Sequence, residues 1–249
     1  MTVEHQAAPA PEHQPPMPTQ EAAADGQASD VLQDPRALQI LTTEHWSLLS
    51  ARSLAYNEAF SRAAMFLSFL SATLIVVGFI FAADLLSEAV LPIIALLLGI
   101  NLFLGVATLG RMAFASEEEF TAIRGMNRIR HAYADLLPGI ERYFVASIHD
   151  DARGILASFG NSSGPSPFLG IMRGLTTAIG MLAVINCVLL GALLSVIAAG
   201  LGATPPAAIA IGVVGFLLAF VLMSVGGARM ALSAFRDEDS MFPTPDVQP

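Results

Sequence analysis

Residues 174–228 read GLTTAIGMLAVINCVLLGALLSVIAAGLGATPPAAIAIGVVGFLLAFVLMSVGGA, a run of 55 positions without a charged side chain. One helix crosses the roughly 30 Å hydrocarbon core of a bilayer with about 20 apolar residues, so this run is long enough for two helices. Glycine and proline between residues 200 and 206 are typical of a turn and divide the run into spans 174–198 and 206–228. Each span is expected to be helical, because backbone groups in lipid must find their hydrogen-bond partners within the protein.

Two further charge-free intervals lie earlier in the chain. Residues 63–83 and residues 89–110 carry no charged side chain, and each interval is long enough for one spanning helix. The sequence therefore predicts an all-α fold, a four-helix transmembrane bundle built from two hairpins, 63–110 and 174–228.

The composition agrees with a membrane protein and argues against an ordinary soluble globular protein and against a nucleic-acid-binding protein. Hydrophobic residues make up 54% of the 249 positions and charged residues 13%, against about 25% in an ordinary soluble domain. The mean hydropathy is +0.63 and the net charge is −9. No segment is a basic arm, so the chain lacks the electrostatic footprint of a nucleic-acid-binding protein.

The arginines all fall on one side of this threading, and there is no lysine. They precede the first span, occupy the segment 111–173 and follow the fourth span, whereas the first hairpin turn carries Asp84 and Glu88. The positive-inside rule therefore predicts that both termini and the segment 111–173 lie in the cytoplasm.

The segment before the first span has two parts. Residues 1–35 are rich in proline and acidic side chains and contain no basic residue, which predicts disorder. Residues 36–62 are expected to form an amphipathic cytoplasmic helix, N-capped by Thr42 or Thr43, that runs directly into the first span. Its predicted apolar stripe consists of large side chains at helical spacing: Trp46, Leu49, Tyr56 and Phe60.

The segment 111–173 is the largest part outside the spans. Its beginning is expected to continue the second span through Ile129, a proline marks a break, and a second helix is expected over about 138–158, before a loop at 160–167. About 60 residues are too few for an independent enzyme domain, so we expect a small helical cap on the membrane face. The cytoplasmic tail, 229–249, is expected to be loose.

The spans contain no ionisable side chain, which argues against a proton-coupled pump. Their strongest polar residues are Asn101 and Asn186, each about halfway along its span. Two interpretations stay open: a midplane polar site, or hydrogen bonds that hold helices together. Small residues four positions apart, such as Gly191 and Ser195, favour close helix contacts within one chain or between copies in a homo-oligomer.

Two main functional hypotheses follow, both with the lipid bilayer as a partner. The first is a non-enzymatic interaction or regulatory protein whose cap binds an unidentified cytoplasmic protein. The candidate surface residues are aromatic, charged or amide side chains: Trp46, Tyr56, Asn57, Glu58, Arg130, His131, Tyr133, Tyr143 and Phe144. The alternative is an oligomeric channel or small-solute transporter, with a pore lined by Asn101, Asn186, Thr73 and Ser195.

Catalysis has no support in the sequence, which contains no phosphate-binding loop, dinucleotide fingerprint, hydrolase elbow or zinc-protease helix. A membrane enzyme would need groups that converge from among Glu58, His131, Glu141, His149 and Asp151. Neighbouring helix positions face different directions, so His149-Asp150-Asp151 is better explained as surface charge than as a metal site. We therefore predict no catalytic residue, no cofactor and no metal.

Several stretches have a strong individual character: TTEHWSLLSARSLAYNEAFSR at 42–62, RIRHAY at 128–133, ERYF at 141–144 and HDD at 149–151. Together they resemble a group of four-span integral membrane proteins of high-GC, actinobacterial-type bacteria, over about residues 38–235. The resemblance implies the four-span architecture and a location in the bacterial inner membrane. It brings no assigned activity and no functional residue.

Overall fold

The computed structural model describes residues 31–159, 174, 176–234 and 240–245. Within these ranges the protein is entirely helical, with four long α-helices, one short α-helix and one 3-10 turn. Residues 1–30 of the tail expected over 1–35, and the loop expected at 160–167, lie outside the described residues. Residues 31–35 are described: residues 33–35 form a turn, and Asp34 N donates to Val31 O at 3.3 Å.

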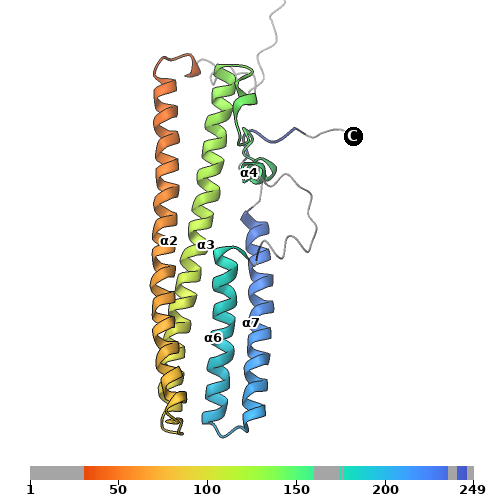
Figure 1. Ribbon diagram of the computed structural model, residues 1–249. Helices are drawn as coiled ribbons and strands as arrows, with labels where there is room; N and C mark the ends of the chain where they lie inside the picture. The colour runs from red at the N-terminus through yellow and green to blue at the C-terminus, as the bar shows by residue number, and fades with distance from the viewer. Residues whose placement is uncertain (1–30, 160–173, 175, 235–239, 246–249) are drawn as a thin grey trace, which may run out of the picture.

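The two longest helices, α2 (Ala37–Ala82) and α3 (Leu91–Leu136), run side by side and antiparallel (Figure 1). Each has 46 residues, which is about 69 Å at 1.5 Å per residue, or roughly twice the hydrocarbon thickness of a bilayer. The helix expected over 36–62 therefore continues unbroken through the first span, and the second span continues past Ile129.

The second pair of helices is shorter. Helix α6 (Ala178–Gly200) packs against α3, and α7 (Pro205–Ala234) packs against α6, alongside only one part of the length of α3 (Figure 1). Helices α2, α3, α6 and α7 are all long and apolar enough to cross a membrane. The prediction of four spanning helices is confirmed to that extent, and the architecture fits a multi-pass membrane protein.

The turn between α2 and α3 and the turn between α6 and α7 close by the same hydrogen-bond pattern. After α2, Asp84 has a positive φ of 54°, and Leu85 N donates to Ile80 O at 3.1 Å. After α6, Gly202 has a φ of 87°, and Ala203 N donates to Ala198 O at 3.0 Å. These are Schellman-type ends, in which one left-handed residue lets the chain leave the helix. The turn expected between the last two spans is present: Gly202 supplies the positive φ, and α7 begins at Pro205.

Small side chains form the interface between α2 and α3, which differs from the expected stripe. Ala59 and Ala63 are buried against Met112 and Ala115, next to the buried Phe66. Alanines four positions apart let the two helices approach closely, so the larger side chains stay outside. The predicted apolar stripe is not the face that packs against α3, because three of its members are exposed: Trp46, Leu49 and Phe60.

Two local predictions are also wrong. Thr42 and Thr43 lie inside α2, where each hydroxyl donates to the carbonyl four residues earlier, and the helix begins after Arg36. The helix expected over 138–158 is instead a 3-10 turn, η1 (Ile140–Tyr143), and a short helix, α4 (Ala152–Ser158). Gly139 has a positive φ of 91°, and the chain turns there between the end of α3 and the start of η1.

The described arginines all lie at one end of the bundle, and Asp84 and Glu88 lie in the turn at the other end. We call this end the polar end and define it as residues 36–62 and 111–159, Arg229 near the end of α7, and residues 240–245. The last of these, which we call the C-terminal segment, belongs to the tail 229–249 that the sequence predicts to be loose. It is instead held beside α4 by hydrogen bonds from four of its residues (Figure 1).

Candidate functional site

A buried carboxylate joins α2 to α3 in the polar end. The side chain of Glu119 is only 7% exposed. Arg52 of α2 donates from Nε to Glu119 Oε1 at 2.9 Å, and the Tyr56 hydroxyl donates to Oε2. Burial, the hydrogen bond to Glu119 and its negative charge raise the pKa of Tyr56 to about 12, so this hydroxyl keeps its proton at neutral pH. The three groups clamp the charged halves of the two long helices together.

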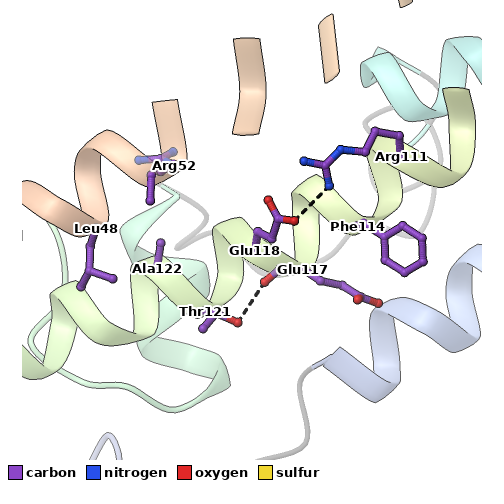
Figure 2. A pocket seen from close by; sticks show the side chains of 9 residues that line it. Leu48, Arg52, Arg111, Phe114, Glu117, Glu118, Thr121 and Ala122 are labelled. Carbon is purple, nitrogen blue, oxygen red and sulfur yellow. Dashed lines mark hydrogen bonds and ion pairs between the residues drawn. The ribbon is translucent and has the colours of Figure 1, made fainter. Parts of the chain in front are cut away.

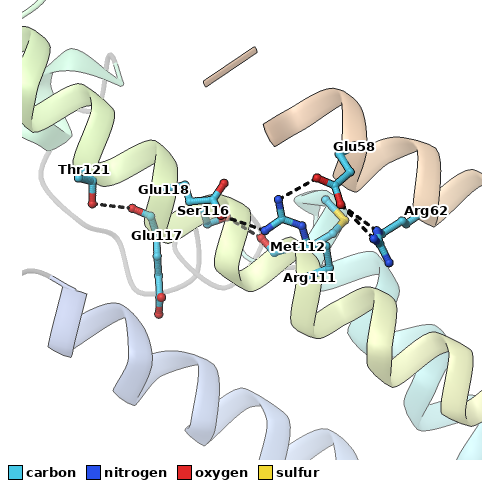
Figure 3. Close-up of polar contacts among 8 residues, drawn as sticks. All are labelled: Glu58, Arg62, Arg111, Met112, Ser116, Glu117, Glu118 and Thr121. Carbon is cyan, nitrogen blue, oxygen red and sulfur yellow. Dashed lines mark hydrogen bonds and ion pairs between the residues drawn. The ribbon is translucent and has the colours of Figure 1, made fainter. Parts of the chain in front are cut away.

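A row of exposed ion pairs follows towards the apolar part (Figure 3). Glu58 lies between two arginines, 3.0 Å from Arg62 and 3.2 Å from Arg111, and Arg111 also reaches Glu118 at 3.0 Å. Hydrogen bonds from Arg111 and Arg62 lower the pKa of Glu58. Such solvated pairs contribute little stability, and their place beside the spans suits arginines at a membrane surface.

A groove of about 600 Å³ opens between α2 and α3 at this level (Figure 2). Its walls combine apolar and charged side chains: Leu48, Ala51, Arg52, Arg111, Phe114, Glu117, Glu118, Thr121 and Ala122. Both of its arginines are already paired with glutamates, Arg52 with Glu119 and Arg111 with Glu58 and Glu118. The groove therefore has no uncompensated positive charge with which to select an anion.

Asp150 organises a second buried cluster, which joins it to Arg128 of α3 and to the C-terminal segment, 90–92 residues further along the chain. Its side chain is fully buried and accepts four hydrogen bonds. Arg128 Nε donates to Oδ2 at 2.7 Å, and Met241 N donates to the same oxygen at 3.0 Å. Ser240 Oγ and Phe242 N donate to Oδ1 at 2.9 and 2.8 Å. One carboxylate thus holds three consecutive residues of the C-terminal segment.

The electrostatics of Asp150 follow from these bonds. Burial alone would raise the pKa of its carboxyl group. The hydrogen bonds from Met241, Arg128, Phe242 and Ser240 outweigh burial and lower the pKa from 3.8 to about 2. The group is therefore ionised at neutral pH, and its charge is compensated by Arg128 and by backbone N–H groups.

Two further contacts complete the site. The Thr244 hydroxyl donates to Asp151 Oδ1 at 2.7 Å, and the same oxygen accepts from Gly154 N at 2.9 Å as the N-cap of α4. The ring of Phe242 stacks on His131 of α3, with 3.9 Å between the ring centroids and 18° between the planes. We call Asp150, Asp151 and His131 the docking cluster.

Residues of α3 hold the docking cluster from behind. Asn127 is fully buried; its Nδ2 donates to His149 O at 2.7 Å, and its Oδ1 accepts from Arg130 and from Ser158. A Cβ at Gly154 would overlap the carbonyl group of His149, so only glycine permits this approach of α4 to residue 149.

The first midplane asparagine bonds across the bundle. Asn101 Nδ2 donates to Thr73 Oγ1 of α2 at 2.7 Å and to Leu97 O of its own helix at 2.9 Å. Its amide oxygen is buried without a hydrogen-bond partner. Asn101 therefore links α2 to α3, which agrees with the interpretation of the spans' asparagines as helix–helix contacts.

The second midplane asparagine bonds only within α6, where Asn186 Nδ2 donates to Leu182 O at 2.8 Å. Its amide oxygen is also buried without a partner and faces Gly105 of α3, where a Cβ would overlap it. Asn186 thus packs one turn of α3 away from Asn101 and is not hydrogen-bonded to it. Close contact between α6 and α7 has the same basis, since a Cβ at Gly191 would lie 2.7 Å from Gly212 O.

The nine candidate surface residues do not form one patch. Tyr56, Asn57 and Glu58 lie near the clamp at Glu119, whereas Trp46 is exposed further out on α2. Arg130 donates to Asn127 behind the docking cluster, and His131 is part of that cluster. Both side chains are partly buried, as is Tyr133 on the same helix. Tyr143 is exposed on η1, beside the partly buried Phe144.

Of the five groups named for the enzyme hypothesis, the structure brings His131, His149 and Asp151 near one another, with 6.4 Å between the two imidazole centroids, whereas Glu58 and Glu141 lie elsewhere. Asp151 caps α4, His131 stacks on Phe242, and Glu58 belongs to the exposed ion pairs. Across the part of the chain that the structure describes, no three His, Cys, Asp or Glu side chains gather as a metal site requires.

Sequence reasoning missed Glu119, Asn127, Arg128 and Phe242, because each acquires its role only through a contact distant in sequence. The sequence around Asp150 gave no signal for its contact with the C-terminal segment. Searches of protein-family models, curated proteins and solved structures find no match to this chain.

Proposed function

We propose that this chain is a non-enzymatic, multi-pass membrane protein that binds a protein partner with its polar end, and that the polar end lies in the cytoplasm. One observation supports this proposal. Buried charged side chains are concentrated in the polar end, around Glu119 and Asp150, while the NH₂ groups of the asparagines in the spans bond within the bundle.

Buried charges are costly unless fully paired, and a simple membrane anchor needs none of them. In the polar end they hold two long helices and the C-terminal segment in a defined arrangement. An ordered surface of this kind suits recognition of another protein. Its cytoplasmic location is proposed from the arginines, which the positive-inside rule places on that side.

Site-specific photocrosslinking in cells tests the proposal. A photoreactive residue at Tyr143, which is exposed in the polar end, is expected to give a protein adduct of defined mass. The matched control is Leu86, which is exposed in the turn at the opposite end and should give no such adduct. Equal adducts at both positions, or none at Tyr143, would contradict the proposal.

A channel or small-solute transporter is the second candidate, and one specific observation favours it. The amide oxygens of Asn101 and Asn186 are buried without hydrogen-bond partners, which is uncommon in native structures. Water or a solute in a widened state of the bundle would satisfy both oxygens. Solute flux that depends on these asparagines would favour this candidate.

A further inference from the structure

The docking cluster is held in place independently of the C-terminal segment. Arg128 fixes Asp150 from α3, at 2.7 Å, and Asn127 fixes the neighbouring carbonyl of His149, also at 2.7 Å. Asp151 is fixed by its capping bond to Gly154 N. Each of these anchors remains when residues 240–245 are taken away. The cluster is therefore a preformed binding site rather than a product of the segment that lies in it.

The segment, in contrast, is held almost entirely by polar contacts. Met241 is 65% exposed, and Pro243 and Pro245 are exposed as well. Only Phe242 places an apolar ring against the protein, on His131. Segments with few buried apolar contacts open at low free-energy cost. A preformed site that holds a segment through hydrogen bonds, with few buried apolar contacts, is suited to exchange of that segment.

The contacts define the chemistry of the ligand. Asp150 takes two successive backbone N–H groups and one hydroxyl, and Asp151 takes a second hydroxyl four residues later. His131 takes an aromatic ring between them. The matching peptide is extended and free of negative charge, and it carries Ser or Thr on both sides of an aromatic residue.

We propose that the docking cluster is a peptide-binding site, that residues 240–245 occupy it in cis, and that a hydroxyl-bearing segment of a partner protein displaces them. This inference rests on the proposed function and names the kind of segment that the polar end recognises. A phosphoryl group on Ser240 or Thr244 removes a donor and places negative charge against two carboxylates, so phosphorylated segments are excluded.

Binding of a capped, fluorescein-labelled peptide with the sequence SMFPTP to the full chain in nanodiscs tests the proposal. The wild-type chain competes with its own segment, whereas Ser240→Ala/Phe242→Ala/Thr244→Ala weakens that competitor and leaves the docking cluster unchanged. The peptide is expected to bind the triple variant at least tenfold more tightly than the wild type. Adding Asp150→Asn to the triple variant is expected to abolish binding.

A second measurement needs no change in the docking cluster. The same peptide phosphorylated on its threonine is expected to bind the triple variant at least tenfold more weakly. Equal binding of the two peptides, equal binding to wild type and triple variant, or no binding to the triple variant would overturn the inference. In the last case the segment is a permanent part of the fold. A photocrosslinked adduct at Tyr143 would still stand, so the proposed function and this inference fail separately.

Discussion

The substitution Asp150→Asn is expected to release the C-terminal segment. In the native protein each carboxylate oxygen accepts two hydrogen bonds: Oδ1 from Ser240 and Phe242, and Oδ2 from Arg128 and Met241. An asparagine supplies one acceptor oxygen, but its NH₂ group must then face two donors. The substitution therefore removes the negative charge and at least two of the four bonds.

The magnitude follows from the bonds that hold the segment. The bond from Met241 N to the charged carboxylate is lost, at about 1.5–3 kcal/mol. The bonds from Ser240 and Phe242 change from charge-assisted to neutral, which costs about 1 kcal/mol each. The total loss of about 3.5–5 kcal/mol corresponds to roughly a 400- to 5000-fold increase in the open population.

Hydrogen exchange followed by mass spectrometry measures this opening. The amide N–H groups of Met241 and Phe242 donate to Asp150 and should be protected in the wild-type chain. They are expected to exchange at the unprotected rate in Asp150→Asn. Glu141→Gln is the matched control, because it makes the same acid-to-amide change on an exposed side chain of η1. Wild-type protection in Asp150→Asn would refute the assignment of the carboxylate as the anchor.

Three further predictions concern other parts of the chain. Gly105→Ala should lower the free energy of unfolding by about 1–3 kcal/mol, because the added methyl group overlaps the Asn186 side chain of α6. Gly99→Ala has open space around it and should not lower the free energy of unfolding; thermal unfolding in detergent compares the two variants. Glu119→Gln should lower the pKa of Tyr56 from about 12, because a charged acceptor is lost while burial remains, as ultraviolet titration would show; an unchanged pKa would contradict the clamp. Acid should release the C-terminal segment, because the pKa of Asp150 in the folded protein, about 2, lies below its ordinary value of 3.8. The stabilisation by this carboxylate is complete above about pH 4 and is lost as the pH falls towards 2. Exchange protection of the segment that persists at pH 2 would argue against this linkage.

The sequence predicts the spanning helices well, because bilayer thickness imposes a length that charge-free intervals reveal. It does not show which face of a helix packs against its neighbour. Trp46, Leu49 and Phe60 have helical spacing, but the alanine stripe at Ala59 and Ala63 packs against α3 and leaves the large side chains outside. Spacing alone does not show which face permits the closer approach.

The candidate site could be predicted only in part. The sequence shows the chemical character of Asp150, Asp151 and His131, but their common partner is the C-terminal segment, and Phe242 lies 92 residues after Asp150 and 111 after His131. A segment of mostly proline and polar residues gives no local signal for docking. Its place is decided by the geometry of α3 and α4, through Arg128 and Asn127.

Solute flux through proteoliposomes tests most directly the claim that the polar end, and not the interior of the bundle, performs the function. The wild-type chain is compared with Asn101→Leu/Asn186→Leu and with Ser71→Leu, a control whose exposed hydroxyl bonds only to its own helix. If the polar end performs the function, a panel of ions and small solutes crosses all three preparations at the rate of empty liposomes. Flux that the wild type and Ser71→Leu support and the double variant loses would contradict that claim and make the two asparagines a transport site.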